Sequence, residues 1–265
     1  MLTIGLVLQI IILFALPIIV GLWLNRRWRI SWMPFLGGAL AFVVSWVIVS
    51  LIPFGGALNL VVASIVQMGA LYLIYRFQLK TVRTEREAIM VGVGLGGIEL
   101  ILLGVIALFT LVQMLPLDGA PDEILIDLAA RIERIEADEV TPSQIDDLRE
   151  LSDEYWRRPW YEPLVQLVQP LTVLVIQAAL SVIVLGAVKQ NDLRPLFGAM
   201  ALHYLSRVLP AYGAARGGVG VWLVLSLAFG VLAAWFLARL WPTIQDQNEV
   251  ALEQRRKIER QAGKA

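Results

Sequence analysis

The chain has 265 residues, of which 58% are hydrophobic and 17% charged, and its mean hydropathy is +0.72. Soluble domains have about 45–50% apolar and about 25% charged residues. A globule of this size cannot bury the apolar excess, which excludes an ordinary soluble protein and indicates a polytopic membrane protein. Its formal net charge is zero, and its basic residues are scattered over short loops and a tail, a pattern that does not favour nucleic-acid binding. The absence of cysteine excludes disulfides, a thiolate nucleophile and Cys-ligated metal.

Apolar stretches along the chain are long enough, or nearly so, to cross a bilayer at about 1.5 Å rise per residue. We therefore predict an all-α, polytopic transmembrane helix bundle of about seven spans. The predicted spans are Thr3–Leu24, Trp32–Ile52, Leu58–Tyr75, Ala88–Leu115, Pro163–Val188, Pro195–Tyr212 and Gly217–Leu240.

Lysine and arginine in short loops set the predicted orientation, because they favour the cytoplasm. Basic residues gather at Arg26–Arg29, at Arg76–Arg86, at Lys189–Arg194 and in the tail. Among the other loops, the one around Pro53–Ala57 has no basic residue, and the one before the last span has only Arg216. The N-terminus is thus predicted outside the cell and the C-terminus in the cytoplasm. We expect the membrane to be the plasma membrane of a prokaryote. Residues 1–115 would hold spans one to four, 116–162 an extracytoplasmic segment, 163–240 spans five to seven, and 241–265 a cytoplasmic charged tail.

The predicted extracytoplasmic segment is strongly acidic, with 14 acidic and 5 basic residues between Pro116 and Glu162, a local net charge of −9. A helical hairpin is the simplest structure for it. Helical spacing relates the apolar residues of the first helix, and Thr141–Gln144 has the form of a capping box that opens the second. The apolar residues of the two helices are Ile124, Leu128, Ile132 and Ile135, and Ile145, Leu148, Leu151 and Tyr155.

Two interpretations of this hairpin stay open. It is either a lid or partner-docking element, or a solvated connector, and we prefer the connector because charge-rich segments predict function weakly. Trp156, Trp160 and Tyr161 stand where interfacial aromatic residues are expected.

Ionisable residues deep in the spans are costly and therefore informative. Glu99 lies in span four, and His203 and Arg207 lie four residues apart in span six, so the latter two share a helix face. Counted from the cytoplasmic ends, Glu99 lies about 17 Å deep, His203 about 12 Å, and the span-five residue Gln177 about 17 Å. We therefore expect these side chains to share one buried layer.

Glycines precede the glutamate in span four. Gly92 and Gly96 form a small-xxx-small pair, which lets a neighbouring helix approach closely on the side that carries Glu99. The run Gly92–Gly97 matches neither a dinucleotide-binding fingerprint nor a P-loop, since no strand precedes it. We interpret Gly92 and Gly96 as helix-packing residues.

A carboxylate and an imidazole at the same depth allow two interpretations. Glu99 would activate a water for attack on a peptide bond while His203 relays the proton or polarises the carbonyl. Alternatively, Arg207 neutralises Glu99 in a buried ion pair that holds the helices in register. Intramembrane charges also line transport paths, but few polar residues line these spans and no inverted repeat is visible, so a transporter ranks last.

Three stretches of the sequence resemble the YhfC-type family of membrane peptidases, which is distantly related to the CAAX-processing (CPBP) glutamic intramembrane proteases. The resemblance lies in Arg86–Glu99, with its Gly-x-Gly-x-Gly-Gly-Ile-Glu run, in Gln177–Val184 and in Ala199–His203. It covers spans four to six and implies a peptidase fold with Glu99 and His203 as catalytic residues.

The sequence departs from that family at three polar positions. Leu95, Gln177 and Arg207 stand where the family has histidine, histidine and an acidic or amide residue. Gln177 and Arg207 would then support the site, as a hydrogen-bond donor and as a modulator of the glutamate. One histidine and one glutamate are too few protein ligands for catalytic zinc, so no metal site or cofactor is predicted, although a weakly held metal stays open.

The sequence thus predicts an intramembrane peptidase-like protein in which a glutamate-activated water attacks a peptide bond, with a partly eroded motif set. The alternative is a non-catalytic membrane scaffold or partner-binding protein of the same fold. The expected partners are the lipid bilayer and a membrane protein or peptide substrate, with no nucleic acid.

Overall fold

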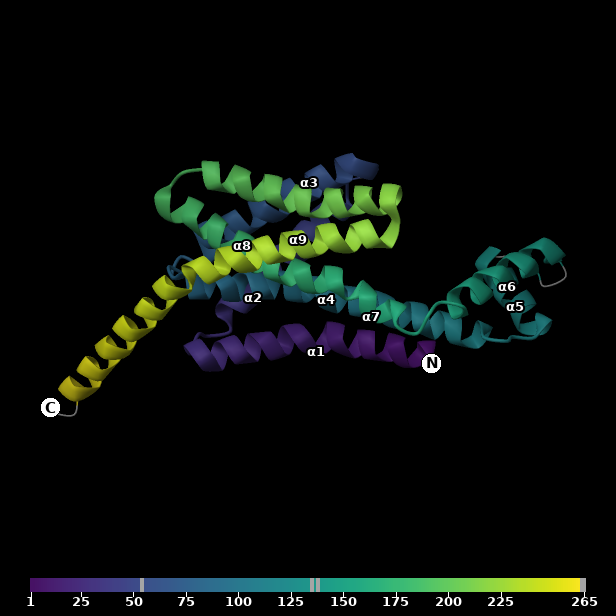
Figure 1. Ribbon diagram of the computed structural model, residues 1–265, viewed down its shortest axis with the longest axis horizontal. Helices are drawn as coiled ribbons and strands as arrows, with labels where there is room; N and C mark the ends of the chain where they lie inside the picture. Colours follow the sequence, from purple (N-terminus) through teal and green to yellow (C-terminus); the bar gives the residue numbers. More distant parts are fainter. Residues whose placement is uncertain (53–54, 134–135, 137–138, 263–265) are drawn as a thin grey trace. The chain divides into compact units, whose positions relative to one another are not determined.

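The computed structural model describes residues 1–52, 55–133, 136 and 139–262, and these residues form helices with no strand among them. The predicted all-α class is therefore confirmed. Two residues of the sequence analysis, Pro53 and Ile135, lie outside the described residues. The α-helices, labelled in Figure 1, are α1 (Leu2–Trp28), α2 (Met33–Ser50), α3 (Gly56–Leu73), α4 (Glu85–Met114), α5 (Asp122–Glu133), α6 (Pro142–Trp156), α7 (Glu162–Gln166), α8 (Val168–Gln190) and α9 (Arg194–Ala262). The π-helical turn η1 (Ile74–Gln78) follows α3, and the 3₁₀ turn η2 (Leu115–Leu117) follows α4.

Six helices among the described residues are long and apolar enough to cross a membrane. The last of them, Arg194–Leu240, has 47 residues, which corresponds to about 70 Å of helix against a hydrocarbon core of about 30 Å. Gly218 interrupts it with φ 69° and ψ −167°, a conformation that favours glycine. Helix α9 doubles back within its length (Figure 1), so this segment is long enough for two crossings, consistent with about seven spans.

The chain divides into two compact units. The first unit comprises Met1–Phe14 and Leu102–Leu167, and the second comprises Ala15–Ile101 and Val168–Ala265. Helices α1 and α4 therefore contribute residues to both units.

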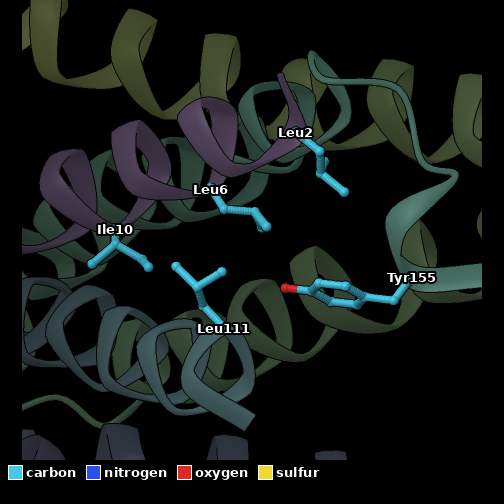
Figure 2. Packing of buried hydrophobic residues seen from close by; sticks show 5 residues of the cluster. All are labelled: Leu2, Leu6, Ile10, Leu111 and Tyr155. Atoms are coloured by element: carbon cyan, nitrogen blue, oxygen red, sulfur yellow. The ribbon is translucent and has the colours of Figure 1, made fainter. Parts of the chain in front are cut away.

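An apolar cluster forms the core of the first unit. Leu2, Leu6 and Ile10 recur at a spacing of four along α1, and Leu111 and Tyr155 join them from α4 and α6. Figure 2 shows these side chains directed toward one another. Because residues four apart lie on one helix face, this face of α1 is covered by the unit.

Hydrogen bonds attach α6 to the segment that follows α4. The hydroxyl of Ser152 donates to the carbonyl oxygen of Leu117 at 2.8 Å, and the indole nitrogen of Trp156 donates to that of Met114 at 3.3 Å. Both carbonyls lie where α4 gives way to η2, so these side chains satisfy acceptors that the helix end would leave without partners.

Two helices begin with a reciprocal contact between their N-terminal residues. In α6 the Thr141 amide donates to the side-chain oxygen of Gln144 at 2.8 Å, as the predicted capping box requires. In α4 the Thr84 amide donates to a Glu87 carboxylate oxygen at 3.1 Å, and the Glu87 amide donates to the Thr84 hydroxyl at 3.3 Å. The sequence thus sets where both helices start.

Glycines let α4 approach helices on two sides within the second unit. A Cβ at Gly92 would lie 2.4 Å from the Cα of Ala178 and 2.5 Å from the carbonyl oxygen of Gln177, both in α8. A Cβ at Gly94 would lie 2.0 Å from the carbonyl oxygen of Phe35 in α2. Backbone atoms cannot move aside as a side chain can, so both helices pack against α4 at a distance that only glycine permits.

Gly96 lies one turn further along α4 and faces the same helix as Gly92. Its Cβ would lie 3.2 Å from the Cα of Leu174 and 3.3 Å from the Cβ of Gln177. The glycine face of α4 therefore ends against Gln177, three residues before Glu99.

We predict that Gly92→Ala destabilises the protein by about 1–3 kcal/mol, because the added methyl group must separate α4 from α8. Gly69→Ala is the matched control, since a Cβ at that α3 position meets nothing within 4 Å. Thermal unfolding in detergent measures both. Equal melting temperatures for the two variants would show that Gly92 has no packing role.

Candidate functional site

His203 in α9 is held by side chains from two other helices. Its Nε2 lies 3.2 Å from Nε2 of Gln177 in α8, and its Nδ1 lies 2.9 Å from Oγ of Ser64 in α3. His203 is 3% exposed, and its partners Gln177 and Ser64 are also buried. One imidazole therefore connects α3, α8 and α9 inside the second unit.

The hydrogen-bond network also defines the tautomer of His203. The Ser64 hydroxyl donates to the carbonyl oxygen of Leu60 at 2.8 Å, so its oxygen must accept from His203 Nδ1–H. Nε2 then carries the lone pair and accepts from the Gln177 amide nitrogen. The imidazole is neutral with both nitrogens engaged, and no lone pair is left for a metal or for a proton from water.

Glu99 in α4 pairs with Arg207 in α9. A guanidinium nitrogen of Arg207 donates to Oε1 of Glu99, and the two side chains are 21% and 12% exposed. A carboxylate in an apolar helix bundle needs a nearby cation because low-dielectric surroundings penalise isolated charge. Arg207 follows His203 by one helical turn, so one face of α9 carries both contacts.

Within the described part of the chain, some buried polar side-chain atoms of α3, α4 and α8 have no hydrogen-bond partner. They are Oε2 of Glu99, Oε1 of Gln177 and Nε2 of Gln67, which lies one turn after Ser64 in α3. Unpartnered buried polar atoms are uncommon in folded proteins. These atoms could therefore form further hydrogen bonds in addition to the Gln177–His203 and Arg207–Glu99 contacts.

The structure brings the sequence-predicted residues together in two pairs. Gln177 meets His203 and Arg207 meets Glu99, while no hydrogen bond joins Glu99 to His203 in the described part of the chain. The assignment of catalytic and supporting roles stays a prediction. We call Glu99, Gln177, His203, Arg207 and Ser64 together the polar cluster.

Sequence reasoning missed Ser64 and a second buried contact nearby. Tyr75 in η1 and Ser181 in α8 share a hydrogen bond of 2.7 Å. Helical spacing offered a signal for both serines, since Ser64 precedes Gln67 by three residues and Ser181 follows Gln177 by four. Serine is common in membrane helices, however, and only the folded chain shows which hydroxyls have side-chain partners.

The described residues contain no group of three or more His, Cys, Asp or Glu side chains that could hold a metal ion. Catalytic zinc normally takes three protein ligands and keeps a fourth position open. In the polar cluster, both histidine nitrogens are engaged and the one carboxylate is bound to a guanidinium. This donor set does not fit catalytic zinc.

Residues 56–225, which include α3, α4, α8 and the first part of α9, match a family described as YhfC intramembrane metalloprotease. The chain belongs to this family. No curated protein and no solved structure matches the chain. The match contains every residue of the polar cluster, so the cluster lies within the part of the chain that defines the family.

The description of the YhfC family implies a metal, and the polar cluster does not supply its ligands. Arg207 places a fixed positive charge on the carboxylate that would be the strongest metal ligand there.

We predict that Arg207→Met destabilises the protein by roughly 3 kcal/mol, because it leaves the Glu99 carboxylate without its cation. Glu99→Gln in the same chain should recover part of that loss. Unfolding of the two single variants and the double variant in detergent measures the coupling free energy. Single effects that add to within about 0.5 kcal/mol would show that the pair is not energetically coupled.

We also predict that the purified protein, equilibrated with zinc and dialysed, retains far less than one zinc ion per chain. His203→Gln should leave this amount unchanged, because the imidazole has no free lone pair. Elemental analysis by mass spectrometry provides the measurement. One zinc per chain, lost in the His203→Gln variant, would overturn our interpretation of the cluster.

Proposed function

We propose that this protein is a non-catalytic member of the YhfC family, an integral membrane scaffold that binds a partner protein and does not cleave it. The observation that carries the proposal is the pairing within the polar cluster. Glu99 is bound to Arg207, and both nitrogens of His203 have hydrogen-bond partners. The groups that would perform hydrolysis instead connect α3, α4, α8 and α9.

Hydrolysis requires a base that accepts a proton from water and a donor that stabilises the developing oxyanion. If Glu99 acted as this base, a proton taken up on its unpartnered Oε2 would cancel the negative charge that pairs with Arg207. His203 would have to break its hydrogen bond to Gln177 or Ser64 before it could relay a proton. Breaking either hydrogen bond of His203 leaves a buried polar group unpaired, which costs about 1–3 kcal/mol.

A second candidate function is a peptidase without a resident metal. Glu99 would be the base, His203 the proton relay or oxyanion partner, Gln177 a hydrogen-bond donor and Arg207 a modulator of the glutamate. The unpartnered Oε2 of Glu99 favours this candidate, because a water or a substrate N–H could donate to it.

One experiment separates the two candidates. Wild-type protein and the Glu99→Gln variant are expressed at equal levels in host membranes, and new protein N-termini are labelled and identified by mass spectrometry. We expect the same set of termini from both proteins, because Glu99 has a structural role. Thermal unfolding of Glu99→Gln verifies that the variant is folded.

A set of N-termini that appears with the wild type and is missing with the folded Glu99→Gln variant would overturn the scaffold proposal. It would establish the peptidase, with Glu99 as the residue on which cleavage depends.

A further inference from the structure

The first unit contains an open groove that the polar cluster does not explain. It lies between α5, α6 and the end of α4 and has a volume of about 500 Å³. Ile124, Leu128 and Ile132 line it from α5, and Leu148 and Leu151 line it from α6. We call it the hairpin groove.

The first unit covers only part of the apolar face of α5. Leu125 and Ala129 are 2% and 3% exposed, whereas Ile124 and Ile132 on the adjacent side of the helix are 45% and 60% exposed. Across the groove, Leu151 is 47% exposed. Exposed isoleucine and leucine side chains that face one groove form a surface suited to binding an apolar partner.

The segment that forms most of the hairpin groove carries surplus negative charge, while the charged residues that line the groove itself, Asp127 and Arg131, pair with each other. Residues 116–162 contain 14 acidic and 5 basic residues. Three of the arginines already pair with aspartates, which leaves most of the acidic side chains without an arginine of their own. These ion pairs are Arg131 with Asp127, Arg149 with Asp122 and Arg157 with Asp153.

We propose that the hairpin groove binds an amphipathic, positively charged helix of a partner protein. The apolar face of that helix would cover Ile124, Ile132 and Leu151, and its lysines and arginines would meet the acidic segment that forms most of the groove. Recognition of an amphipathic helix by an apolar groove is a common binding mode, and complementary charge adds specificity and speeds association.

Charge distinguishes this partner from a lipid surface. Helices that lie on membranes present lysine and arginine on their polar face. The segment that forms most of this groove, residues 116–162, instead carries 14 acidic and 5 basic residues, so anionic headgroups would repel it. This inference rests on the first unit alone and does not depend on the role of Glu99.

The test uses the full chain in nanodiscs of phosphatidylcholine and a fluorescent amphipathic helical peptide of leucine and lysine. Fluorescence anisotropy should show saturable binding that weakens as salt is raised, because salt screens the charges. The double variant Ile132→Asn with Leu151→Asn should weaken binding about tenfold or more. The two side chains are about half exposed, at 60% and 47%, so the change should leave the fold intact, as thermal unfolding verifies.

Leu115→Asn is the matched control, because Leu115 is 48% exposed and does not line the groove. It should bind the peptide as the wild type does. Equal loss in this control would overturn the proposal, as would equal binding of a leucine–glutamate peptide. Equal binding of the leucine–lysine peptide to empty nanodiscs would also overturn it, because the peptide would then be binding lipid.

Discussion

Charged and hydrogen-bonding groups are costly to bury in an apolar helix bundle, and this cost determines how the polar side chains of the second unit pair. Glu99 and Arg207 satisfy this requirement for each other, and His203 satisfies it through Gln177 and Ser64. Lipid-facing helices gain little from burying apolar surface against one another, so close packing and buried polar contacts hold such bundles together. The same contacts that stabilise these helices also engage both nitrogens of His203 and one carboxylate oxygen of Glu99, while the second oxygen, Oε2, has no partner among the described residues.

Close packing and polar pairing act on the same helices. Gly92 and Gly96 bring α4 against α8 beside Gln177, and Glu99 follows on α4 within one turn. A bulkier residue at either glycine would move Gln177 and Glu99 apart as well as the helices. The glycines and the polar cluster are therefore one structural arrangement, and the family match over residues 56–225 contains both.

The first unit differs in that apolar side chains stay exposed. Its acidic α5–α6 hairpin is bound to the end of α4 and to η2 through Ser152 and Trp156, yet part of the apolar stripe of α5 is uncovered. A solvated connector needs no such stripe, because polar residues would serve equally well. The exposed isoleucines are thus better explained by a partner than by the hairpin's own stability.

Hydropathy and helical spacing were sufficient to predict the all-α class, the membrane-spanning helices and the start of α6 at Thr141, because these depend on local composition and on hydrogen bonds within a few residues. The same reasoning selected Glu99, Gln177, His203 and Arg207 as buried polar residues. It could not decide which of them would pair, because helix rotation and approach place side chains from distant segments. Only the tertiary structure put the guanidinium on the glutamate and added Ser64 to the histidine.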